Sequence, residues 1–89
     1  MGQTNGALAR EKVNQVFLEV FGKNPKKWSE AQKKGSLFAK DLGFEAIDLM
    51  VLFRELERRL NIHFDAEDVT TQRFDIYENI IRAVENKLV

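Results

Sequence analysis

Apolar side chains recur at helical spacing in three stretches of the chain, and each stretch predicts an amphipathic helix. The stretches cover residues 7–21, 45–60 and 75–88. Gly22 and Asn24-Pro25 follow the first stretch, and both are typical of a helix end. The side chains expected to face the core are Val13, Val16, Phe17, Val20 and Phe21 in the first helix, Leu49, Phe53, Leu56 and Leu60 in the second, and Tyr77, Ile80, Ile81, Val84 and Leu88 in the last.

The connection between the first two helices, residues 22–44, is long and rich in large apolar side chains. A structureless loop of this length is unusual inside a small domain. We therefore expect an ordered strap across the domain, with a helical turn near residues 29–34. The apolar side chains that predict this order are Trp28, Leu37, Phe38, Leu42 and Phe44.

Two acidic pairs with a spacing of three residues mark further helix starts. Asp65 with Asp68 resembles the cap of a short helix, and Asp75 with Glu78 has the spacing of a capping box. No segment alternates between apolar and polar residues as a strand does. The pattern predicts an all-α fold in a single domain, residues 1–89: a bundle of three main helices plus one short helix, with a long loop between the first and second helices.

The second helix has more apolar surface than one core requires. Ile47, Met50, Val51 and Leu52 widen its stripe beyond one face. Such a surplus often marks a side that faces a partner. A small bundle that surrounds this helix would explain the same pattern, so the pattern alone leaves both interpretations open.

Composition narrows the chemistry. An apolar fraction of 44% in 89 residues supports a packed core and argues against intrinsic disorder. The absence of cysteine excludes a disulfide, a thiolate metal site and a cysteine nucleophile, and the single histidine, His63, excludes a two-histidine metal site. The acids Asp65, Glu67 and Asp68 lack the glycine and the spacing of a calcium loop. We expect no metal site and no enzymatic activity.

Charge is balanced over the whole chain but not along it. Residues 1–40 hold eight Lys or Arg against three Glu, a net charge of +5, and residues 41–89 hold six against eleven acids, a net charge of −5. A nucleic-acid-binding domain is usually basic overall, so this class of partner is disfavoured. No apolar run is long enough to span a membrane, and the start lacks a signal-peptide pattern. We expect a cytoplasmic protein without stable membrane insertion.

One short motif carries a family resemblance. It reads Asp41-Leu42-Gly43-Phe44-Glu45-Ala46-Ile47-Asp48-Leu49. It resembles the motif of acyl carrier proteins, roughly D-L-G-x-D-S-L-D, which opens the second helix of that family. The order of helices and the long first loop are similar too, so the resemblance covers nearly the whole chain. Residues 36–40 before the motif, and Thr70-Thr71 with Phe74 before the last helix, also look like their family counterparts.

The resemblance implies a carrier that presents thioester-linked acyl intermediates to enzymes of fatty-acid or specialised lipid biosynthesis. In that family a 4′-phosphopantetheine arm is joined to the motif's serine by a phosphodiester. The matching position here is Ala46, which has no hydroxyl. Because Ser29 and Ser36 lie outside the motif, we expect the chain to stay unmodified.

Two explanations of Ala46 remain open. An otherwise intact motif favours a serine that was replaced by engineering. Three successive departures from the family pattern, Glu45, Ala46 and Ile47, favour natural loss of the attachment site. In the second case the chain is a pseudo-carrier, a non-catalytic subunit that binds an acyl-processing enzyme. Codon 46 of the gene distinguishes the two explanations, because serine there restores the carrier and alanine supports the pseudo-carrier.

The resemblance also implies two surfaces. In the family the second helix docks partner enzymes and the phosphopantetheinyl transferase, and the core can open to admit an acyl chain. The expected docking face consists of Glu45, Ile47, Asp48, Val51, Arg54, Glu57 and Arg58. Val51 and Arg54 depart from the family pattern, which predicts a specialised set of partners. The expected channel residues are Phe53, Leu56, Leu60, Ile62, Ile80 and Ile81. A small carrier of this kind is expected to be a monomer.

Overall fold

The computed structural model describes residues 5–71 and 73–88, and over these ranges helices supply all the regular secondary structure. The long helix α1 (Asn5–Phe21) is followed by the 3₁₀ turn η1 (Pro25–Lys27) and the short helix α2 (Glu30–Lys34). The remaining helices are α3 (Ala46–Leu60), α4 (Ala66–Thr71) and α5 (Tyr77–Lys87). The all-α prediction is confirmed for the described residues. None of their helices combines the length and the hydropathy needed to cross a bilayer.

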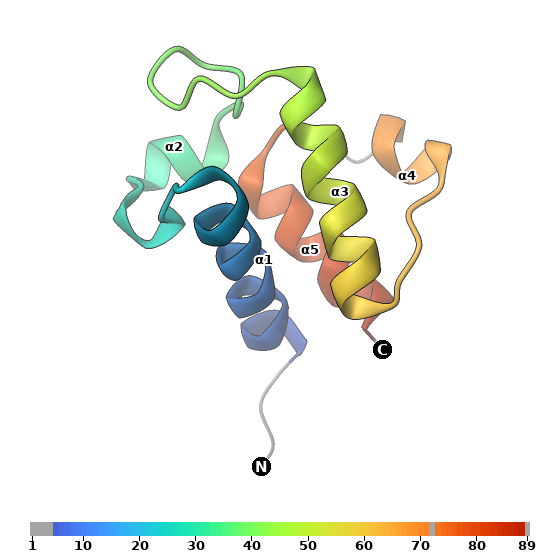
Figure 1. Cartoon of the computed structure of the whole chain (residues 1–89). Helices are drawn as coiled ribbons and strands as arrows, with labels where there is room; N and C mark the ends of the chain where they lie inside the picture. The colour runs from blue at the N-terminus through green and yellow to red at the C-terminus, as the bar shows by residue number, and fades with distance from the viewer. Residues whose placement is uncertain (1–4, 72, 89) are drawn as a thin grey trace.

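Helix α1 contacts both α3 and α5, and α2 packs against α5. Figure 1 shows α1 and α2 on one side of the molecule and α4 on the other side, beyond α3. Polar contacts join α1 to the start of α5. Arg10 donates two hydrogen bonds to the Glu78 carboxylate, at 2.9 and 3.0 Å, and the Tyr77 hydroxyl donates to Asn14. These contacts hold the first and last helices together.

The buried side chains form one hydrophobic cluster, to which α1, α3 and α5 all contribute. Val13, Val16 and Phe17 of α1 are buried, as the periodicity predicts. Val20 was also expected in the core but is 38% exposed in the last turn of α1, where Phe21 packs against the core instead. The core residues of α5 are Tyr77, Ile80, Ile81 and Val84, in agreement with the predicted stripe, and Leu88 packs at its edge.

The buried face of α3 is rotated from the predicted one. Leu49 and Leu56 are buried as expected, but Phe53 and Leu60 are only half-buried. Leu52, which was expected to add apolar surface, is fully buried. The helix therefore uses the positions Leu49, Leu52 and Leu56 to pack on the core, and Phe53 lies at the edge of this contact.

The segment between α1 and α3 is an ordered strap, as its apolar residues predict. Leu37, Leu42 and Phe44 are buried and Trp28 packs against the core, whereas Phe38 remains exposed. The predicted helical turn near residues 29–34 is confirmed as α2. Its cap is reciprocal, because Gln32 N donates to Ser29 Oγ and Ser29 N donates to the Gln32 side chain.

Of the two predicted acidic caps, one is confirmed and one is wrong. At the start of α4, Asp65 and Asp68 each accept a hydrogen bond from the other's backbone N–H, at 2.9 and 3.1 Å. Asp75 does not cap α5, which begins at Tyr77 after Ile76. The Asp75 carboxylate is occupied by Ser36 and Arg73 instead.

Candidate functional site

The motif segment forms a turn that leads into α3. Gly43 lies in the left-handed region, with φ of 71°, a conformation that favours glycine. Its backbone N–H donates to Ala39 O at 2.7 Å and closes the turn. On either side, Leu42 and Phe44 are buried in the core. Two buried anchors and one glycine turn therefore fix where α3 begins.

The first turn of α3 is stabilised by motif acids. Glu45 precedes the helix, and its N–H donates to the Asp48 carboxylate at 2.9 Å. Asp48 also places a negative charge near the positive end of the helix dipole. Asp41 lies outside the helix, where it accepts a hydrogen bond from Gln32 at 3.0 Å. Asp48 thus has a structural role in addition to its predicted place on the docking face.

Ala46 is the first residue of α3 and is exposed to solvent. Its methyl group lies at the edge of an apolar pocket of about 300 Å³. The pocket is formed where α3, α4 and the strap meet the segment before α5. Its lining residues are Phe38, Ala46, Leu49, Met50, Phe53, Val69, Phe74 and Asp75.

Exposed apolar side chains gather around this position. Among the described residues, seven large hydrophobic side chains are exposed, and five of them are part of α3's outer side or of the pocket. Ile47 is 59% exposed and Met50 is 61% exposed. The full set of five is Phe38, Ile47, Met50, Val51 and Val69. Clustering of this kind marks an interaction surface more often than isolated exposed residues do.

The predicted docking residues divide into two groups. Glu45, Ile47, Val51, Arg54 and Arg58 are exposed, and the last four recur at helical spacing along the outer side of α3. Arg58 forms an ion pair with Glu55 at 2.7 Å. This outer side is therefore apolar near Ala46 and basic toward the end of the helix.

Two predicted docking residues are held by contacts within the chain. Asp48 is half-buried and caps α3 as described above. Glu57 is also half-buried and accepts a hydrogen bond from Phe64 N at 2.8 Å. His63 Nδ1 lies 3.4 Å from the same carboxylate, and its side chain is 83% exposed. Glu57 fixes the segment between α3 and α4, which limits its availability to a partner.

Only one of the six predicted channel residues lines the pocket, namely Phe53. Leu56, Ile80 and Ile81 are buried in the core, and Leu60 and Ile62 pack against its edge. An acyl channel through those five residues stays a prediction. The pocket beside Ala46 is formed instead by residues that the pattern did not single out for it: Phe38, Leu49, Met50, Val69, Phe74 and Asp75.

Asp75 is the charged residue in the pocket lining. Its carboxylate accepts hydrogen bonds from Ser36 Oγ at 2.9 Å and from Arg73 at 3.0 and 3.2 Å. The Arg73 guanidinium is the main reason why the pKa of this carboxyl is lowered, although burial opposes the effect and Ser36 assists it. Asp75 is therefore ionised at neutral pH, and it ties the strap to the start of α5.

Ala46, at the position that the motif resemblance assigns to the phosphopantetheine arm, does not fit such an arm. Attachment needs a side-chain hydroxyl at position 46, and alanine has none. Ser29 caps α2 and Ser36 donates to Asp75, so both hydroxyls have other roles. No group of three or more His, Asp or Glu side chains that could hold a metal ion exists within residues 5–71 and 73–88.

Comparison of the chain with protein-family models, with curated protein sequences and with solved structures gives no match.

Proposed function

We propose that this chain is a non-enzymatic domain of the acyl carrier type that works by docking acyl-processing enzymes. The observation that carries the proposal is the position of Ala46. The motif turn at Gly43 delivers it, exposed, to the start of α3 and to the edge of an apolar pocket. This is where a carrier needs its attachment residue, because an arm there reaches solvent and an apolar cargo has a pocket beside it.

The order of elements supports the same proposal. The motif resemblance implies a first helix, a long ordered connection, a helix opened by the motif, a short helix and a closing helix. The described helices α1, α3, α4 and α5 follow this order, and η1 and α2 lie within the connection. Fold likeness alone does not assign function, so the proposal depends on the site at Ala46.

Ala46 determines what the domain does in this form. A methyl group cannot form the phosphodiester, so the chain holds no arm and no thioester cargo. Its activity is then recognition: it occupies the carrier site of a partner enzyme, either as an unmodified carrier or as a pseudo-carrier subunit. The pseudo-carrier is a second candidate function, favoured by the missing hydroxyl itself.

The surface of α3 indicates the character of the partner. Ile47 and Val51 offer apolar contact, and Arg54 and Arg58 offer positive charge. Complementary charge speeds encounter and sets orientation. The proposed partner is a cytoplasmic enzyme of lipid or secondary metabolism whose carrier-binding surface has an apolar centre and acidic residues facing Arg54 and Arg58.

The test restores a side-chain hydroxyl at position 46 and asks whether a phosphopantetheine arm can then be attached. The Ala46→Ser variant is incubated with coenzyme A and a broad-specificity phosphopantetheinyl transferase, and its intact mass is measured. We expect the mass of one arm to be added at position 46 and none to be added to the parent chain. Serine should leave the fold intact, because its helix propensity lies only about 0.5 kcal/mol below that of alanine.

Ala66→Ser provides a matched control. Like Ala46, Ala66 is the first residue of a helix. It follows Asp65, which has Asp68 three positions further on, just as Ala46 follows Glu45, which has Asp48 three positions further on. Modification of Ala46→Ser but not of Ala66→Ser supports a carrier site that is recognised by its surroundings. If neither variant gains the arm while both remain folded, the carrier proposal is wrong.

A further inference from the structure

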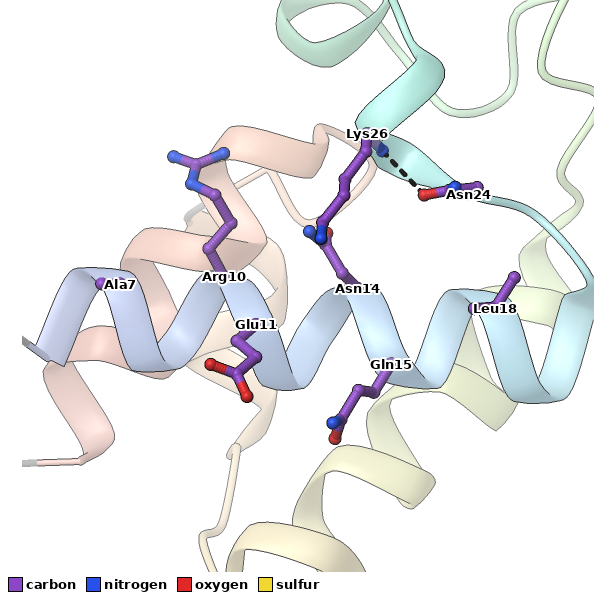
Figure 2. A pocket seen from close by; sticks show the side chains of 8 residues that line it. All are labelled: Ala7, Arg10, Glu11, Asn14, Gln15, Leu18, Asn24 and Lys26. Carbon is purple, nitrogen blue, oxygen red and sulfur yellow. Dashed lines mark hydrogen bonds between the residues drawn. The ribbon is translucent and has the colours of Figure 1, made fainter.

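A groove on α1 lies apart from the site at Ala46. It has a volume of about 630 Å³ and runs between α1 and the turn that contains η1 (Figure 2). The α1 positions in its lining include Ala7, Glu11, Asn14 and Leu18, which recur at helical spacing along one side of the helix. At 1.5 Å per residue this row is about 16 Å long, the length of three helical turns.

The groove is more basic than acidic. Arg10 and Lys26 are in its lining, against the single acid Glu11. Figure 2 shows the Lys26 side chain extending from η1 back toward α1. Lys27 follows Lys26 directly and Lys23 lies three residues before it, and both are exposed. An anionic group that enters between η1 and α1 therefore meets the positive charges of Lys26 and Arg10.

Two lysines of α2 also act near the end of the groove at Arg10. Arg10 is paired with Glu78, but Lys33 and Lys34 of α2 act on the same carboxylate and help to lower its pKa. Arg10, Lys33 and Lys34 thus all act on the Glu78 carboxylate.

The lining is not wholly polar. Leu18 is 53% exposed at one end of the row, which makes it one of the most exposed large apolar side chains among the described residues. Asn14 accepts the Tyr77 hydroxyl through its carbonyl oxygen, so its amide group is left to donate. The groove therefore offers positive charge, a hydrogen-bond donor and one apolar contact along a helical row.

We infer that this groove binds an acidic amphipathic helix of a partner protein, with the partner's carboxylates facing Arg10 and Lys26 and an apolar side chain on Leu18. An α-helix laid along α1 matches the length of the row and the spacing of its side chains. A nucleic acid fits less well, because the lining holds no aromatic ring on which a base can stack.

The groove and the α3 surface share no residue, so one chain can hold both partners at once. Glu19, which pairs with Arg59 of α3 at 2.6 Å, lies on another side of α1 from the groove. The inference therefore does not depend on carrier function at Ala46. Either proposal can fail without the other.

The test uses fluorescence anisotropy with two labelled helical probe peptides of the same length. One carries glutamate and leucine at helical spacing, and the other carries lysine in place of glutamate. We expect the acidic probe alone to bind the full chain, and Lys26→Glu to weaken binding about tenfold, as the loss of one complementary charge contact with added repulsion does. Leu18→Ala should weaken it several-fold.

Lys40→Glu is the matched control, because Lys40 is exposed and lies outside the groove lining. It makes the same change in net charge and should leave binding unchanged. Equal losses from Lys26→Glu and Lys40→Glu, or no binding of the acidic probe at low salt, would overturn the inference. So would two further results: tighter binding of a DNA duplex with no effect of Leu18→Ala, or self-association of the chain that Lys26→Glu abolishes.

Discussion

The core contains two separate aromatic clusters, and only one of them lines a pocket. The closed cluster consists of Phe17, Phe21, Trp28, Phe44 and Tyr77, with Phe17 in contact with the other four rings at centroid distances of 5.3 to 6.0 Å. The open cluster consists of Phe53, Phe64 and Phe74, whose centroids lie 5.1 to 6.0 Å apart. Edge-to-face geometry, which favours aromatic pairs, occurs in both clusters, whereas Phe17 is tilted against Phe21 and Tyr77.

The difference lies in what surrounds the rings. Polar contacts fix the edge of the closed cluster, since Arg10 binds Glu78 and also lies over the Tyr77 ring. In the open cluster, Phe53 and Phe74 form part of the pocket beside Ala46. The open cluster therefore leaves apolar surface accessible in this pocket, where a partner can reach it.

Truncation of the two clusters should have unequal effects on stability. Phe17→Ala removes a fully buried ring and should lower the free energy of unfolding by about 3–5 kcal/mol. Phe53→Ala removes a half-buried ring and should cost about half as much. Urea unfolding followed by circular dichroism measures both. If Phe17→Ala does not fold, Phe17→Leu serves in its place, and equal costs at positions 17 and 53 would contradict the comparison.

The link between the strap and α5 should have the next largest effect. Asp75→Ala leaves Ser36 and Arg73 without their acceptor and should lower the free energy of unfolding by about 1–3 kcal/mol. Asp41→Ala removes one exposed hydrogen bond and should change stability by about 0.5 kcal/mol or less. The same urea experiment compares them. Indistinguishable variants would show that Asp75 does not hold the pocket wall.

Acid should weaken the closed side through Glu78. The hydrogen bonds from Arg10, with the charges of Lys33 and Lys34, hold the pKa of this carboxyl below its ordinary value of 4.5. Because the folded pKa is lower than the unfolded one, the pair adds stability above about pH 4.5, and this contribution is lost as the pH falls through the folded value. This change in the free energy of unfolding should be smaller than the changes expected for the ring truncations and for Asp75→Ala.

Unfolding free energies measured from about pH 6 to about pH 3 test this contribution. Glu78→Gln should reduce the fall in stability across that range. Glu30→Gln, at an exposed position in α2, should follow the parent chain. A Glu78→Gln profile parallel to that of the parent would show that the ion pair with Arg10 contributes nothing to the pH dependence.

Local pattern predicts the elements well and their long-range contacts poorly. Periodicity predicts helices over 7–21, 45–60 and 75–88, and the structure has them at Asn5–Phe21, Ala46–Leu60 and Tyr77–Lys87. The Asp75 cap was wrong because α5 begins two residues later, at Tyr77, and the carboxylate accepts hydrogen bonds from Arg73 and from Ser36, which is distant in sequence. Spacing between neighbours carries no information about a partner 39 residues away.

The same limit applies to the candidate site. The motif alone places position 46 at the start of a helix, because Gly43 permits the turn and the acid at Asp48 suits the helix start. The pocket beside it depends on Phe38 and Val69, which reach it from the strap and from α4. Both side chains are exposed, and the sequence pattern does not show that they lie side by side in a pocket. Only the tertiary arrangement brings them together.

The most direct test of the central claim, that the α3 surface around Ala46 is the docking face, is an NMR titration of the chain with Ala46 in place. Backbone amide shifts are followed while a phosphopantetheinyl transferase is added without coenzyme A, so that recognition is measured without chemistry. The account predicts shifts concentrated on residues 45–58 and around the pocket, and their loss when Ile47→Glu is used. Shifts confined to α1 and α2, or none at all, would contradict it.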